Sequence, residues 1–131
     1  MNKKYSEEWF SKANKDYDTA IELFKLNKDK FYEIILFHIQ QCVEKYLKGF
    51  LAFNNIKINN THSIEKLLIQ TNEIDDFSSV LNIIQLTPFA VNIRYPGDEF
   101  QFSKEDVKEY IDLADKTIKL IKFLIAEDRL L

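Results

Sequence analysis

The sequence predicts an all-α protein: an up-and-down four-helix bundle with one additional short helix, in a single domain of residues 1–131. Three observations support this fold class. The chain has only two glycines and two prolines, whereas sheets need turn residues at frequent intervals. Hydrophobic residues make up 46% of the sequence, enough for a chain of this length to bury a core. Several long segments repeat their apolar residues with the period of a helix.

The first helix is expected over residues 6–26. Ser6 is predicted to be the N-cap, and the acidic residues Glu7 and Glu8 suit the first turn of a helix. The apolar side chains fall within an arc of about 120°. They are Trp9, Phe10, Ala13, Tyr17, Ala20, Ile21 and Phe24. This pattern is typical of a bundle helix with one buried stripe.

The second helix is expected over residues 29–54. Its first turns are apolar on nearly all sides, so we expect it at the centre of the bundle, partly against a second subunit. A loop over residues 54–60 follows. Thr61 or Ser63 then caps a short helix that ends near Thr71.

A fourth segment is expected from Asp75 or Asp76 towards residue 94. Pro88 either begins a new segment or kinks one helix, and Pro96 disfavours helical backbone at the residue before it. Residues 95–98 suit a tight turn. The last helix is expected over residues 103–126, with Ser103 and Asp106 as a shorter capping box.

Composition restricts the function classes. The net charge of −3 gives no global attraction to nucleic acid, so any phosphate site must be local. Cys42 is the only cysteine, which excludes an internal disulfide and favours a reducing compartment. The N-terminus lacks the apolar run of a signal peptide, and no stretch approaches the length of a membrane span. We therefore expect a soluble, cytoplasmic protein.

Polar residues on the second helix do not form one solvent face. Gln41, Lys45 and Lys48 share a narrow stripe with His38, beside a wide apolar surface. They could present three donors to a phosphate or a base. The alternative is a helix-surface ion pair between Glu44 and Lys48, which have the favourable spacing and order. His38 is interpreted as a core histidine with a hydrogen-bond partner.

Arg94 and His62 are the other candidates. The chain has 18 basic residues, of which only Arg94 and Arg129 are arginine, and a guanidinium binds phosphate or carboxylate bidentately. Alternatively, Arg94 pairs with Glu44 or Asp98 and fixes the turn. His62 could act as a general base or phosphate donor, or could simply cap or pack at a helix start.

Other kinds of site lack a matching pattern. One cysteine and two separated histidines match no zinc spacing. Gly49 and Gly97 stand alone, so there is no glycine-rich phosphate loop. No Ser-His-Asp arrangement can be argued from spacing. We therefore expect no metal, no cofactor and no catalytic residue.

Three motifs, at residues 37–48, 61–67 and 93–98, together resemble the HEPN domain family of prokaryotes. The resemblance covers about residues 6–126. The resemblance implies a compact helical homodimer that binds a nucleotide or RNA. It also implies a minimal nucleotidyltransferase partner, in a toxin–antitoxin or stress system. The residues that could bind the nucleotide or phosphate are then Gln41, Lys45, Lys48, His62, Arg94, Tyr95 and Asp98.

Some HEPN members are metal-independent ribonucleases that use an arginine followed, after four to six residues, by a histidine. Arg94 matches the arginine, but the positions for the histidine hold Glu99, Phe100 and Gln101. We therefore expect a non-catalytic binding module. An atypical ribonuclease that uses Arg94 with His62 is the alternative, and a structural antitoxin or scaffold without a ligand is the second alternative.

Overall fold

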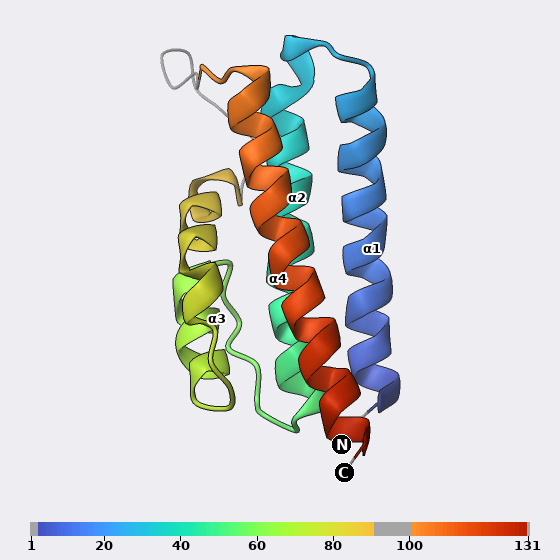
Figure 1. Cartoon of the computed structure of the whole chain (residues 1–131), viewed down its shortest axis with the longest axis vertical. Helices are drawn as coiled ribbons and strands as arrows, with labels where there is room; N and C mark the ends of the chain where they lie inside the picture. Colours follow the sequence, from blue (N-terminus) through green and yellow to red (C-terminus); the bar gives the residue numbers. More distant parts are fainter. Residues whose placement is uncertain (1–2, 91–100, 131) are drawn as a thin grey trace.

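The chain folds as an all-α bundle, and its structure, a computed structural model, describes residues 3–90 and 101–130. The elements are α1 (Lys3–Lys25), η1 (Asp29–Phe31), α2 (Tyr32–Phe53), α3 (Ile64–Asn72), η2 (Ser78–Phe89) and α4 (Lys104–Leu130). Figure 1 shows α1, α2 and α4 side by side along the long axis, with α3 and η2 on the side of α4 away from α1. The described residues contain no strand, and the predicted fold class is confirmed.

Helix α2 lies at the centre, as predicted, and packs against every other element. Most of its residues are buried, including the large side chains of Ile39, Leu47 and Phe50. This burial is achieved within one chain, so the apolar character of α2 does not require a second subunit to cover it.

The contact between α1 and α2 depends on a glycine. The ring of Phe10 stacks on Tyr46, with ring centroids 5.2 Å apart and an interplanar angle of 27°. A Cβ at Gly49 would lie 2.4 Å from Cε1 of Phe10. Only glycine lets the two helices approach this closely at that level of the bundle.

The helix ends follow local chemistry. Asn55 adopts φ 58° after α2, and the Ile56 N–H donates to the Leu51 carbonyl at 2.9 Å, which together form a Schellman ending. The capping box before α4 is confirmed: the Ser103 hydroxyl accepts from the Asp106 N–H, and the Asp106 carboxylate accepts from the Ser103 N–H. The prediction for Ser6 is wrong. Ser6 lies inside α1, buried, and donates to the Lys3 carbonyl.

The fourth segment is a succession of 3₁₀ turns, η2, with non-helical backbone at Val80. Its buried residues are Val80, Ile83, Leu86 and Phe89. They recur every third residue, which matches the three residues per turn of a 3₁₀-helix and places one edge of the segment against the core. The part of this expected segment beyond Ala90, with the turn at residues 95–98, lies outside the described residues.

None of the helices in residues 3–90 and 101–130 is both long enough and apolar enough to cross a membrane.

Candidate functional site

The polar stripe predicted on α2 divides into two clusters in the structure. Gln41 and Lys48 belong to one cluster, which reaches the start of α3 at His62. Lys45 belongs to another, which reaches α1 at Asp16. We call them the Glu44 cluster and the Asp16 cluster, after the carboxylate at the centre of each.

The carboxylate of Glu44 is the centre of the Glu44 cluster, and the Glu44 side chain is buried, with 4% of its surface exposed. One oxygen, Oε1, lies 3.0 Å from Nδ1 of His62 and accepts from Nε2 of Gln40 at 3.2 Å. The other, Oε2, accepts from Nζ of Lys48 at 3.0 Å. Gln41 extends the network, because its Nε2 donates to Oε1 of Gln40 at 2.7 Å.

Local structure places His62 against this carboxylate. Ser63 is the N-cap of α3, and its hydroxyl accepts from the Lys66 N–H at 3.3 Å. The first amide of α3, the N–H of Ile64, donates to Oγ1 of Thr87 in η2. The carbonyl of His62 accepts from Gln40 at 3.3 Å. Contacts from α2 and η2 therefore hold the backbone from the His62 carbonyl to the first residue of α3.

The orientation of the His62 ring follows from the chemistry of its partner. An ionised carboxylate can only accept, so Nδ1 of His62 carries the proton in this contact, and Nε2 is the nitrogen left to act on a ligand. The His62 side chain is 68% exposed, whereas Glu44 is 4% exposed. An exposed imidazole is thus held by a buried acid.

Lys48 differs from the expected surface pair. The pairing with Glu44 is present, but the two side chains are 9% and 4% exposed, so the pair is buried. The Lys48 ammonium also lies 5.5 Å from the ring centroid of Trp9 on α1. Breaking a buried pair leaves an uncompensated charge, so Glu44 and Lys48 are structurally interdependent.

In the Asp16 cluster, a carboxylate on α1 binds two groups of α2. Oδ1 of Asp16 lies 2.9 Å from Nδ1 of His38, and Oδ2 accepts from Nζ of Lys45 at 2.5 Å. His38 and Lys45 are each 23% exposed. The interpretation of His38 as a core histidine with a hydrogen-bond partner is confirmed for the partner, which is Asp16, but His38 is half-buried and does not belong to the core. Lys45 has its counter-charge within the protein.

Cys42 and Tyr46, on the α1-facing side of α2, are not suited to chemistry. Burial raises the pKa of the Cys42 thiol far above its usual range, with a further increase from the charge of Asp16. Burial also raises the pKa of Tyr46 to about 12, and its hydroxyl donates to the side-chain oxygen of Asn14. Both groups stay protonated and function as packing residues.

Three candidates, Arg94, Tyr95 and Asp98, lie outside the described residues, as do Glu99 and Phe100. Their proximity to the Glu44 cluster therefore stays a prediction.

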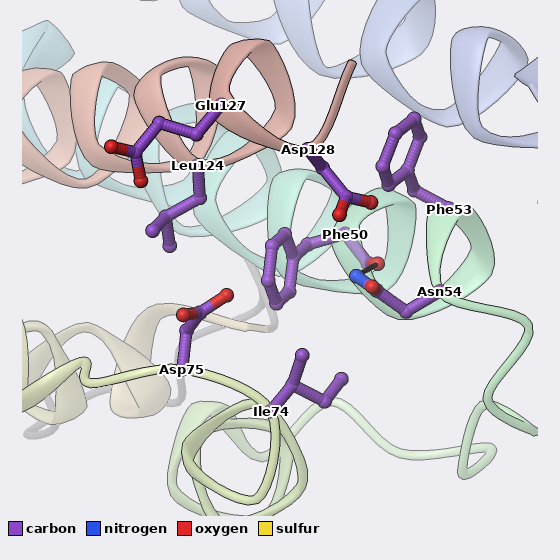
Figure 2. Close-up of a pocket in the computed structure, with 8 residues that line it drawn as sticks. All are labelled: Phe50, Phe53, Asn54, Ile74, Asp75, Leu124, Glu127 and Asp128. Atoms are coloured by element: carbon purple, nitrogen blue, oxygen red, sulfur yellow. Dashed lines mark hydrogen bonds between the residues drawn. The ribbon is translucent and has the colours of Figure 1, made fainter. Parts of the chain in front are cut away.

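Another hollow of the bundle is acidic. A cavity of about 280 Å³ lies at the ends of α2 and α4, beside the residues that follow α3. Figure 2 shows the side chains that line it. The carboxylates of Asp75, Glu127 and Asp128 surround the apolar side chains of Phe50 and Leu124. Three carboxylates repel a phosphate, so this cavity is not the expected phosphate site.

The described ranges contain no group of three or more His, Cys, Asp and Glu side chains placed to hold a metal ion.

The sequence interpretation missed two members of these clusters. Gln40 was not singled out, although it lies one turn before Glu44 and shares its buried side of α2. Asp16 was also missed, because a single acid on a surface helix has no distinguishing pattern. The buried face of Gln40, Glu44 and Lys48 at four-residue spacing was the available signal.

The chain is similar to several known proteins. The HEPN domain family model matches residues 6–124. A curated relative, "Putative toxin MJ1304" of Methanocaldococcus jannaschii, is 30% identical over 97% of this chain and 92% of its own length. The solved structure of ST0689, an archaeal HEPN homologue, is 27% identical with a TM-score of 0.72, over 92% of this chain and 97% of that one.

A second solved structure, TT1696 from Thermus thermophilus, shares the fold with a TM-score of 0.76. It is 23% identical over 93% of this chain and 98% of that one. The match of the family model to most of the chain, together with the relative at 30% identity, decides the classification. The chain belongs to the HEPN domain family.

Proposed function

We propose that this HEPN chain binds the phosphate of a nucleotide or of RNA, with His62 as the group that contacts the ligand. The observation that carries the proposal is the exposed imidazole of His62, held through Nδ1 by the buried Glu44 carboxylate. A ring oriented in this way meets a ligand with little further loss of conformational freedom.

The charges of the site favour His62 over the lysines. Lys48 is matched by Glu44, and Lys45 is matched by Asp16, so neither ammonium adds much net positive charge. A protonated His62 adds one positive charge and a second N–H donor. Arg94, Tyr95 and Asp98 remain part of the proposed site, with Arg94 as the bidentate phosphate donor.

The test compares two histidine variants in binding to a short, labelled, single-stranded RNA, measured by fluorescence anisotropy. His62→Gln removes the imidazole, and His38→Gln is the matched control, because His38 also contacts a carboxylate through Nδ1 but is less exposed. We expect His62→Gln to weaken binding about tenfold, which corresponds to about 1.4 kcal/mol and to the loss of one charge-assisted hydrogen bond. Equal affinities of wild type and His62→Gln would reject His62 as the ligand contact.

A metal-independent ribonuclease is the second candidate, and the Glu44–His62 contact favours it. An imidazole oriented by a carboxylate through one nitrogen can take a proton with the other, as a general base does for a 2′-hydroxyl. Incubation of the same RNA in the presence of a chelator tests this. Cleavage that His62→Gln abolishes and His38→Gln retains would promote the catalytic alternative, and intact RNA would support the binding module.

The proposal includes the biological setting. The relative named "Putative toxin MJ1304" supports a toxin–antitoxin context. A minimal nucleotidyltransferase as partner and a cytoplasmic location are further parts of the proposal. A small nucleotidyltransferase reading frame beside this one would support the partner. The absence of any such frame would favour the scaffold alternative.

We also propose that this chain forms a homodimer. Since α2 is covered within one chain, the support comes from other elements: Ile69 of α3 is 58% exposed and Leu81 of η2 is 44% exposed. These elements pack against each other, so together they present apolar surface that a second copy can bury. Light scattering should give twice the 15.6 kDa mass of one chain. A single species of 15.6 kDa at micromolar concentration would contradict the dimer.

A further inference from the structure

An aromatic cavity lies on α1, near the Glu44 cluster. Tyr5, Glu8, Trp9 and Lys12 line a hollow of about 220 Å³. The rings of Tyr5 and Trp9 meet edge to face, with centroids 6.1 Å apart and an interplanar angle of 66°. Tyr5 is 44% exposed. The hollow therefore presents aromatic surface, one carboxylate and one ammonium to solvent.

These four residues follow the spacing of one helix face, beside the stripe that packs on α2. The packing stripe of α1 uses Phe10, Ala13 and Ala20 instead. Trp9 stands at the border between the two faces: it is half-buried, and the ammonium of Lys48 lies against its ring. The indole is thus fixed from the α2 side, while the cavity adjoins it on the surface of α1.

A series of contacts links this cavity to the proposed phosphate site. Nζ of Lys48 lies 5.5 Å from the Trp9 ring centroid and 3.0 Å from Oε2 of Glu44. Oε1 of Glu44 lies 3.0 Å from Nδ1 of His62. An aromatic hollow and an exposed imidazole therefore stand at the two ends of one short network. A nucleotide likewise has a flat base at one end and a phosphate at the other.

We propose that the hollow lined by Tyr5, Glu8, Trp9 and Lys12 binds a nucleobase, so that the ligand of this chain is a nucleotide unit with an unpaired base. The inference rests on the proposed phosphate binding by His62. The base stacks on the aromatic rings, as bases do in proteins that bind single strands. Glu8 accepts a hydrogen bond from an exocyclic amino group, as carboxylates do from cytosine. Lys12 contacts the ribose–phosphate backbone.

The test uses Trp9, the only tryptophan of the chain, as its reporter. Cytidine 5′-monophosphate and ribose 5-phosphate are titrated into the protein, and quenching of the indole fluorescence is followed. Cytidine 5′-monophosphate should quench the fluorescence, and ribose 5-phosphate should not. A labelled single-stranded RNA should bind more tightly than the same strand in a duplex, because pairing hides the base. If the single strand binds no better than cytidine 5′-monophosphate, the ligand is the free nucleotide.

Two variants separate the base site from the phosphate site. Tyr5→Ala should weaken binding of the single strand about tenfold, since it removes one stacking surface. Phe123→Ala is the matched control, because Phe123 is an aromatic residue of α4 that is 59% exposed.

The outcomes separate the two proposals. Binding that depends on His62 but is equal for wild type and Tyr5→Ala, with no fluorescence change, would overturn the nucleobase site and leave the phosphate site standing. If cytidine 5′-monophosphate quenches the indole fluorescence of His62→Gln with the same affinity as in the wild type, the phosphate site would be overturned and the nucleobase site would stand. If neither probe nor RNA binds the wild-type protein, both proposals fall.

Discussion

Replacing Glu44 by leucine should strongly destabilise the protein. The Glu44 side chain is 4% exposed and its partner Lys48 is 9% exposed, so the variant leaves a buried ammonium without a counter-charge. Removal of one partner of a buried ion pair costs about 3–5 kcal/mol. The variant also removes one of the two acceptors of the Gln40 amide, which adds to the loss.

The double variant Glu44→Leu with Lys48→Met should recover most of this loss. It removes both charges, and well-packed apolar replacements of buried pairs are often neutral or stabilising. The amide of Gln40 loses one of its two acceptors and keeps the His62 carbonyl, so a residual cost of about 1 kcal/mol is expected.

Urea unfolding followed by circular dichroism measures both effects. With a slope of about 2 kcal/mol per molar urea, a loss of about 4 kcal/mol lowers the midpoint by about 2 M. Asp115→Leu is the control, because Asp115 and Lys119 form a pair with the same spacing but are 38% and 75% exposed. That variant should cost less than about 1 kcal/mol. A Glu44→Leu loss no larger than the control, or a double variant no more stable than the single, would refute the reasoning.

Three further outcomes concern packing, capping and alkaline pH. Gly49→Ala should lower the melting temperature, because the added Cβ would lie 2.4 Å from Phe10. This overpacking costs about 1–3 kcal/mol, against a gain in helix propensity of about 1 kcal/mol. An unchanged melting temperature would contradict the close approach of the two helices. Ser103→Ala should cost about 1 kcal/mol in urea unfolding, as the loss of an N-cap does, and no measurable loss would argue against the capping box. Burial holds the pKa of Cys42 far above its usual range and raises the pKa of Tyr46 to about 12, so the unfolded chain releases these protons first. Stability should therefore fall above about pH 9 because of Cys42, and above about pH 10 because of Tyr46 as well, by up to about 1.4 kcal/mol per pH unit for each group. Urea midpoints that stay constant between about pH 8 and pH 10 would contradict this.

The fold was largely predictable because local signals agreed with the packing. Helical periodicity marked α1, α2 and α4, and the serine before α4 caps it as expected. The 3₁₀ structure of η2 was harder to predict from the sequence, although the three-residue spacing of Val80, Ile83 and Leu86 is the spacing that a 3₁₀-helix has. At Ser6 the local preference for a cap was overridden, since α1 begins one turn earlier and buries this hydroxyl.

The site was predictable only in part, because its contacts join distant segments. Gln41, Lys48 and His62 do meet through one network, yet the periodicity of α2 could not show that Lys48 is covered by Trp9 and paired inside the protein. The division of the stripe between Glu44 and Asp16 depends on the packing of α1, which no local pattern encodes.

The central claim is that His62, oriented by Glu44, is the group that meets the ligand. The chain has two histidines, so an imidazole ¹H–¹⁵N spectrum contains two ring systems, which the His62→Gln variant assigns. Both rings contact a carboxylate through Nδ1, and both should show the proton on Nδ1 in their neutral form. Addition of single-stranded RNA should shift Nε2 of His62 and leave His38 unchanged. Saturation with bound RNA that leaves the His62 resonances unmoved would contradict the claim.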